Sequence, residues 1–349
     1  MPKTILKAAV GFILLALLLV IPKHVESPYA LHMMILLFLS VSMGQSWNIL
    51  GGFAGQHSVG HSAYFGVGAY TTMMLMQAKQ IPPWIGVWAG IVLVLIVAMA
   101  IGSICFRLRG PYFVLASIAV AEILRLCAIN LTTLTNGAEG ILVTEIPSFK
   151  IGATILTDFS TKVPFYYIGL FLALLTIAIT YWVQHSKLGY FLQAIREDQD
   201  AAHSLGIPIA FYKNVALVIS AVLTSLAGGF YGVLVGFVDP PTVLGLDVSV
   251  QIMLICIIGG MGTLWGPVLG SLVLVPLSEA LRSNLFTEGL VKVGLVNADS
   301  RIGIFLKENL SHAHVLLYGI LVVLVILFMP DGLMGFMKKL ATRWKREAV

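Results

Sequence analysis

Long, uninterrupted runs of apolar residues dominate the chain, and short polar or glycine-rich stretches separate them. A helix needs roughly 20 apolar residues to cross a bilayer, and continuous apolar runs are typical of spanning helices. The pattern predicts an all-α polytopic integral membrane protein. About ten spans are expected, at residues 5–21, 30–50, 58–77, 84–105, 112–130, 165–184, 212–236, 248–258, 267–282 and 314–329.

One segment, residues 186–213, is more hydrophilic than its neighbours but keeps a helical periodicity. A period near 3.6 residues gives it one apolar face, formed by Leu188, Phe191, Leu192, Ile195, Ala202 and Leu205. The other face carries Arg196, Glu197, Asp198, Asp200 and His203. Gly206 and Pro208 are expected to end this helix. A helix of this kind either docks onto a soluble partner or lies on the lipid surface.

The composition also indicates that lipid is the solvent. Of the 349 residues, 58% are hydrophobic and 11% are charged, against about 25% charged in an ordinary soluble domain. Lys and Arg gather at the N-terminus, in 186–213 and in the C-terminal tail, which the positive-inside rule places in the cytoplasm. We therefore expect one transmembrane domain over 1–349 in the cell inner membrane, with both termini cytoplasmic.

This orientation makes residues 131–164 and 283–313 extracytoplasmic loops. A nine-span alternative, in which 248–282 crosses once with a break, would place the basic tail outside the cell. The net charge of +5 is explained by orientation, and we expect no nucleic-acid partner. Cys105, Cys127 and Cys256 all lie in apolar runs, so neither disulfides nor a metal framework is predicted.

Small residues spaced four apart occur in three predicted spans, as expected where helices pack closely in lipid. They are Ser58, Ser62 and Gly66; Thr224, Gly228, Gly232 and Gly236; and Gly262, Gly266 and Gly270. Two glycine clusters, 51–60 and 259–267, lie between apolar runs. Breaks in helices release backbone groups that lipid cannot pair, so each cluster either borders a substrate path or forms a tight turn.

Charged and histidine side chains within the spans are few. Glu122 and Arg125 share one helix face, and they are expected either to line a substrate path or to pair and hold helices together. His57 and His61 are spaced like metal ligands, but a metal site needs three or four, so His61 is expected to pack or to hydrogen-bond at a helix start. No phosphate-binding loop or catalytic constellation is present, so we predict neither an ATPase nor another enzyme.

Several stretches together resemble the branched-chain amino acid permease family of ATP-binding-cassette (ABC) importers. They are 55–56 with 58–70, 112–113 with 121–125 and 135–140, 194–198 with 200–202 and 205–207, and 259–270. Their joint occurrence is specific, although each alone is not. Asp200 replaces the Glu that many such permeases have before the Ala pair, and His57 lies where a neutral or apolar residue is expected.

The resemblance implies an ABC importer permease fold with a cytoplasmic coupling helix in 186–213. It also implies alternating access, two ATPase subunits that bind ATP and Mg, a second homologous permease and an extracytoplasmic binding protein. The substrate would be a branched-chain amino acid, with no cofactor in this chain. Close relatives carry urea or short amides, and these residues do not distinguish those substrates from branched-chain amino acids. An ion-coupled secondary carrier is the alternative from another functional class.

Two groups of candidate residues follow. The ATPase contact is expected at Arg196, Glu197, Asp198, Asp200, Ala201, Ala202 and Gly206. The translocation path or the helix packing is expected to involve Gln56, His61, Gly66, Glu122, Arg125, Gly228, Gly232, Gly259, Gly260 and Thr263.

Overall fold

The computed structural model describes most of the chain up to residue 282. The described residues are 13, 15–25, 27–106, 108, 110–146, 149–151, 154–157, 159, 161–282, 319, 320, 323, 327 and 332–337. The predicted loop 283–313 and most of the predicted spans 5–21 and 314–329 lie outside them.

The described residues form a helical bundle with a few short strands. Its long helices are α2 (Pro28–Trp47), α3 (His61–Lys79), α4 (Pro83–Cys105), α5 (Pro111–Asn130), α7 (Val163–His185), α10 (Ile209–Val235), α12 (Leu246–Gly259) and α13 (Gly266–Arg282). The shorter helices are η1 (Asn48–Phe53, a π-helix), α6 (Thr132–Thr135), η2 (Gly137–Glu139), α8 (Lys187–Glu197), α9 (Gln199–Ser204) and α11 (Pro240–Leu244). Strand β1 (Ile141–Leu142) pairs antiparallel with β4 (Phe237–Val238), and β2 (Phe149–Ile151) pairs antiparallel with β3 (Thr154–Thr157).

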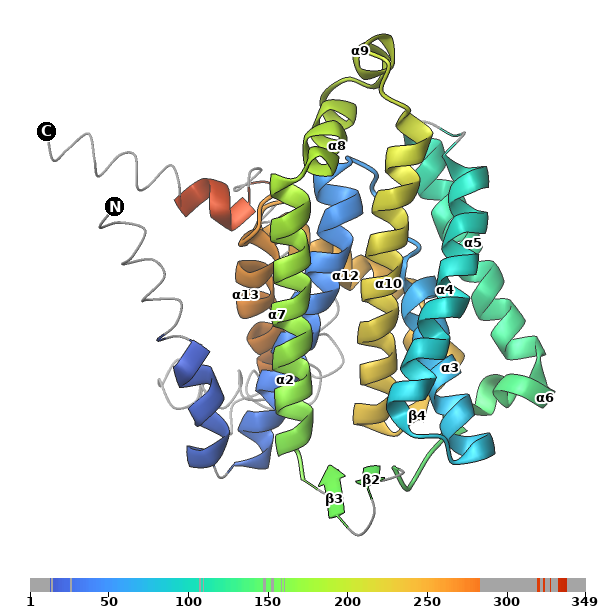
Figure 1. Cartoon of the computed structure of the whole chain (residues 1–349), viewed down its shortest axis with the longest axis vertical. Helices are drawn as coiled ribbons and strands as arrows, with labels where there is room; N and C mark the ends of the chain where they lie inside the picture. Colours follow the sequence, from blue (N-terminus) through green and yellow to red (C-terminus); the bar gives the residue numbers. More distant parts are fainter. Residues whose placement is uncertain are drawn as a thin grey trace, which may run out of the picture.

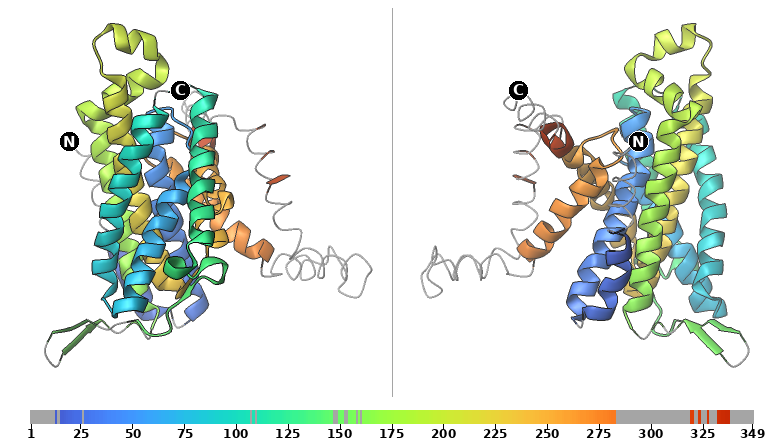
Figure 2. Two further views of the ribbon diagram at one scale, coloured as in Figure 1. Left: turned by 90° about the vertical axis from the view of Figure 1, so that its right-hand side faces the viewer. Right: turned by 60° about the vertical axis from the view of Figure 1, so that its left-hand side comes forward.

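The bundle has two distinct ends. Helices α8 and α9 project beyond one end, and the β2–β3 hairpin lies at the opposite end (Figures 1 and 2). Helix α7 runs from the hairpin end to α8, and α10 returns from α9. The predicted segments 186–213 and 131–164 therefore lie at opposite ends of the molecule.

Among the described residues, six helical segments are long and apolar enough to cross a membrane. They are Pro28–Phe53, Pro83–Cys105, Pro111–Asn130, Val163–His185, Ile209–Val235 and Pro240–Gly259. Helix α3 is less apolar, but it is buried along much of its length and packs mainly on α10 and α4. The expectation of an all-α membrane protein is confirmed, whereas the count of about ten spans stays a prediction.

Helices α12 and α13 form an antiparallel hairpin across the second glycine cluster. A side chain at Gly259 would overlap the carbonyl oxygen of Gly266, and one at Gly270 would overlap that of Ile255. Residues 248–282 therefore double back instead of forming one helix with a break, and the glycines allow the two arms to touch.

Glycines also allow α10 to lie against α3. A methyl group at Gly228 would overlap the carbonyl oxygen of Phe65, and one at Gly232 would lie 3.1 Å from Cγ of Met73. The space that a side chain at Gly66 would take is likewise occupied by Leu244 of α11. These three predicted packing residues therefore lie at helix contacts, as small residues do where backbones approach closely in lipid.

We predict that Gly228→Ala destabilises the protein because the added methyl group meets a backbone oxygen that cannot move aside. Overpacking of this kind costs about 1–3 kcal/mol. The unfolding midpoint of the detergent-solubilised protein measures it. Gly90→Ala is the matched control, since its nearest atom outside α4 would lie at an ordinary 3.4 Å. Equal midpoints for both variants would contradict the packing argument.

Candidate coupling and translocation site

The segment expected to be one helix over 186–205 is two helices, α8 and α9. Ser186 caps α8, with its Oγ accepting from the amide of Gly189. The carboxylate of Asp198 then caps α9, accepting from the amides of Asp200 at 2.9 Å and Ala201 at 3.0 Å. A side-chain cap of this type starts a new helix and ends the old one. The single-helix prediction is therefore wrong, and Leu205, expected on the apolar face, is 81% exposed.

The seven predicted coupling residues separate into two sets. Glu197, Asp200, Ala201 and Gly206 are exposed at the end of the bundle. Ala202 is buried, and the side chains of Asp198 and Arg196 are engaged with this chain itself. Gly206 has φ of +80° and no atom within 4 Å of the position a side chain would take. The first set is exposed to a docked partner, although Glu197 also pairs with Arg196.

Arg196 joins α8 to the first glycine cluster. Its Nη1 donates to the carbonyl oxygen of Gly52, at 2.9 Å, and its Nη2 pairs with Oε1 of Glu197, also at 2.9 Å. A side chain at Gly55, where φ is +66°, would overlap the stem of Arg196. Leu192 and Ile195 are fully buried, so α8 is packed on the bundle as well as hydrogen-bonded to it.

Asn48 joins the first glycine cluster to the second. Its Nδ2 donates to the carbonyl oxygen of Thr263, at 2.9 Å, and its Oδ1 accepts from the amide of Gly262, at 2.8 Å. Gln45 adds a third bond, from Nε2 to the carbonyl oxygen of Leu264, at 2.7 Å. Sequence reasoning did not select Asn48 or Gln45. Their signal was present, because both are polar residues within an apolar run.

Arg196 also contacts the second cluster, since a side chain at Gly262 would overlap its Nη1. The end of α8, the π-helix η1 and the α12–α13 turn are thus held together by two polar side chains, Arg196 and Asn48. Among the other candidates here, Gln56 is buried, and Thr263 Oγ1 donates to the Gly260 carbonyl within the turn. We call this assembly, made of Asn48, Gly52, Gly55, Arg196 and Gly262, the coupling junction.

His61 lies in a buried polar group with Ser220 and Ser46. Its Nε2 is 2.8 Å from Oγ of Ser220, and that hydroxyl donates to the carbonyl oxygen of Ser46, at 2.6 Å. A hydroxyl has one proton, so Ser220 must accept from His61, and Nε2 carries the hydrogen. The expected role of His61 at a helix start is what the structure shows, because α3 begins at this residue.

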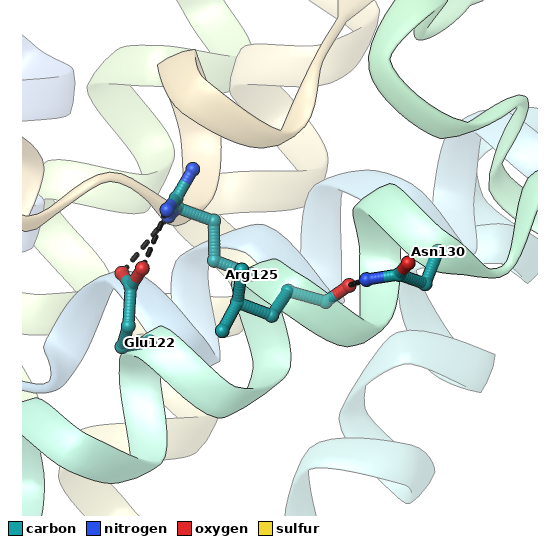
Figure 3. Close-up of polar contacts among 4 residues, drawn as sticks. Glu122, Arg125 and Asn130 are labelled. Carbon is teal, nitrogen blue, oxygen red and sulfur yellow. Dashed lines mark hydrogen bonds and ion pairs between the residues drawn. The ribbon is translucent and has the colours of Figure 1, made fainter.

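Glu122 and Arg125 form an ion pair within α5. Figure 3 shows the carboxylate turned toward the guanidinium, with Nε donating to Oε2 at 2.9 Å and Nη2 donating to Oε1. The side chains of Arg125 and Glu122 are 26% and 38% exposed. An unpaired charge within a bilayer is unfavourable, which explains why the two are paired. The pair joins neighbouring turns of one helix, and among the described residues it makes no hydrogen bond or ion pair to another helix.

The described residues contain no group of three or more His, Cys, Asp or Glu side chains that could hold a metal ion. The arrangement provides a mechanical connection between elements. An exposed helical segment at one end is connected, through partly buried hydrogen bonds, to the stretch after α2 and to the turn between α12 and α13.

Comparison with known proteins identifies relatives over most of the chain. Residues 27–326 match the family described as "Branched-chain amino acid transport system / permease component". The chain is 27% identical to the high-affinity branched-chain amino acid transport system permease protein LivM of Salmonella typhimurium. That alignment covers 69% of this chain and 61% of LivM, so the chain spans less than two thirds of this relative's length.

The chain also matches the LivH permease protein of the same organism, at 25% identity over 86% of this chain and 94% of LivH. A probable LivM permease of Methanocaldococcus jannaschii is 24% identical over 77% of each chain. The family match extends over well over half of the sequence and includes every candidate residue named above. The chain therefore belongs to the branched-chain amino acid transport system permease family.

Proposed function

We propose that this chain is one membrane subunit of an ABC importer that moves branched-chain amino acids into the cytoplasm by alternating access. Two ATPase subunits bind and hydrolyse ATP with Mg, a second homologous permease completes the membrane part, and an extracytoplasmic protein delivers the substrate. The complex lies in the cell inner membrane, with both termini of this chain in the cytoplasm.

The observation that carries this proposal is the coupling junction. An importer driven by ATP must transmit movement from a soluble ATPase to helices within the membrane. Helices α8 and α9 project from the bundle with exposed polar residues, and Arg196 connects α8 directly to both glycine clusters. A helix that only lay on the lipid surface would need no such connection.

In this mechanism the exposed set, Glu197, Asp200, Ala201 and Gly206, meets the ATPase. When the ATPase subunits close, α8 moves, and Arg196 pulls the Gly52 carbonyl with it. Asn48 passes the displacement to the α12–α13 turn through Gly262 and Thr263. The helices on either side of the breaks then re-orient around the path, as gating of packed elements around a central site requires.

The substrate follows from the family. The family description names branched-chain amino acids, as do the LivM and LivH relatives. Short amides and urea are the competing substrates, and no side chain of the described residues excludes them. We assign recognition of the substrate first to the extracytoplasmic binding protein.

We predict that Arg196→Ala uncouples ATP hydrolysis from uptake, because it leaves the Gly52 carbonyl without its donor and separates α8 from the breaks. Amino acid imported per ATP should fall about tenfold, within the usual range of coupling energies. Reconstituted complex in liposomes measures both rates. Lys187→Ala is the control, because it also removes a positive charge from α8 but keeps the Arg196–Gly52 hydrogen bond. Full coupling in Arg196→Ala would refute this role.

Gly206→Leu should also reduce coupling, because the added side chain projects from the exposed set toward the ATPase. Gly110→Leu is a matched control: φ is +57° there, and no atom lies within 4 Å, as at Gly206. Both substitutions place a side chain at positive φ, so both strain the backbone. Uptake per ATP should fall only for Gly206→Leu. Equal losses in the two variants would show that strain, and not docking, is responsible.

Uptake of labelled substrates tests the function itself. Proteoliposomes that contain the full complex and the binding protein should take up labelled leucine only when ATP is present on the side of the membrane that carries the ATPase subunits. Unlabelled isoleucine and valine should compete, and urea should not. Uptake that follows an ion gradient without ATP would support a secondary carrier, and ATP-driven urea uptake would replace the substrate but keep the machinery.

A further inference from the structure

Asp239 lies at a helix start where its carboxylate does not act as an ordinary cap. It precedes α11, and an Asp in this position usually accepts hydrogen bonds from amides of the first turn. Pro240 and Pro241 occupy the first two helical positions, and proline has no N–H. Among the described residues, the Asp239 side chain makes no capping bond or ion pair, and its buried Oδ1 has no hydrogen-bond partner.

Tyr70 of α3 lies near Asp239. A side chain at Gly232 of α10 would lie 3.5 Å from both the carbonyl oxygen of Ala69 and Cγ1 of Val238. The chain neighbours of Tyr70 and Asp239 therefore meet at one point of α10, and the two side chains interact electrostatically. Tyr70 is 5% exposed, and its hydroxyl too finds no hydrogen-bond partner in the part of the chain that the structure describes. Two polar groups without partners thus come together inside the protein.

The loop that follows α5 packs against Asp239. Gly140 has φ of +76°, and a methyl group there would lie 3.0 Å from Cβ of Asp239. Asn136 Nδ2 donates to the carbonyl oxygen of Gly140, at 3.2 Å, and this bond holds the loop in place. Strands β1 and β4 pair beside it, at the end of the bundle opposite α8 and α9 (Figure 1). In the proposed orientation this end is extracytoplasmic, where a delivered substrate enters.

The chemistry of the two groups indicates what completes them. A buried carboxylate without a partner is unfavourable, so a cation that donates hydrogen bonds is the group that fits. A primary ammonium has three N–H donors, enough for the carboxylate and for the phenol oxygen. Urea and simple amides donate hydrogen bonds as well, but they carry no charge and leave the carboxylate uncompensated. Both unpaired atoms are screened from solvent, which favours a small molecule over the side chain of a docked protein.

We propose that Asp239 and Tyr70 form the site at which the permease receives the α-ammonium group of its amino acid substrate. This inference rests on the proposed function, because that function supplies an amino acid as the substrate. It adds a second selection to that of the binding protein, since the permease itself prefers an amino acid to urea or an amide.

Saturation-transfer NMR on the solubilised, assembled complex without its binding protein tests this site directly. The probes are leucine, 3-methylbutylamine, which lacks the carboxylate of leucine, and 4-methylpentanoate, which lacks its ammonium group. Leucine and 3-methylbutylamine should bind. The affinity for 4-methylpentanoate should be at least about tenfold lower, because it brings no cation to the carboxylate.

Three variants assign the binding to these side chains. Asp239→Asn should lower the affinity for leucine and for 3-methylbutylamine at least about tenfold, because it removes the charge that pairs with the ammonium. Asp247→Asn is the matched control, since Asp247 is an exposed acid in the first turn of the next helix, α12. Tyr70→Phe removes only the hydroxyl, so the affinity for the amine should fall about two- to tenfold. It decides the test if Asp239→Asn does not assemble.

Equal binding of 4-methylpentanoate and 3-methylbutylamine would overturn the proposal, and so would the absence of leucine binding to the wild-type complex. An Asp239→Asn complex with a lower unfolding midpoint but unchanged affinity for leucine would do the same, because the two side chains would then serve only the fold. Uptake of leucine by the wild-type complex separates the two failures. ATP-driven uptake persists if only this site is wrong, and it is absent if the proposed function is wrong.

Discussion

Backbone groups released where a membrane helix is interrupted must be paired, because lipid offers them no hydrogen bonds. This chain has two such places, the stretch that follows α2 and the turn between α12 and α13, and polar side chains from other segments pair their backbone groups. Asn48 pairs with Gly262 and Thr263, and Arg196 pairs with Gly52. The hydrogen bond that pairs the Gly52 carbonyl with Arg196 also fixes the position of α8. Structural need and force transmission are thus met by the same few bonds.

Close packing makes this junction possible. Gly52, Gly55 and Gly262 have no side chains where Asn48 and Arg196 must fit, and two of these glycines adopt positive φ. Glycines along α10 and in the α12–α13 hairpin bring backbones together elsewhere in the bundle. Because lipid adds little drive for helices to associate, such contacts supply much of the attraction between them. A rigid bundle can then respond to a displacement at one end.

The sequence predicts the long helices well, since apolar runs give their ends within a few residues: 84–105 became Pro83–Cys105, and 112–130 became Pro111–Asn130. It fails where a side chain competes with the periodic pattern. The Asp198 cap divides 186–205 although the apolar period continues through it. The span expected from 58 begins at His61, because Trp47 Nε1 and Ser117 Oγ bind the non-helical backbone at Ser58 and Val59. The Asn48 clamp joins residues more than 200 positions apart, which no local pattern reveals.

The central claim is that α8 and the α12–α13 turn move as one unit. Spin labels at Tyr190 on α8, Met261 in the turn and Ile104 at the end of α4 are all at exposed positions. Distances between the labels should be measured by pulsed electron paramagnetic resonance in a background without Cys105, Cys127 and Cys256. The assembled complex is measured with and without ATP bound to its ATPase subunits. We expect the 190–261 distance to stay constant while both labels shift relative to 104. A change in the 190–261 distance with a fixed 104–261 distance would contradict the account.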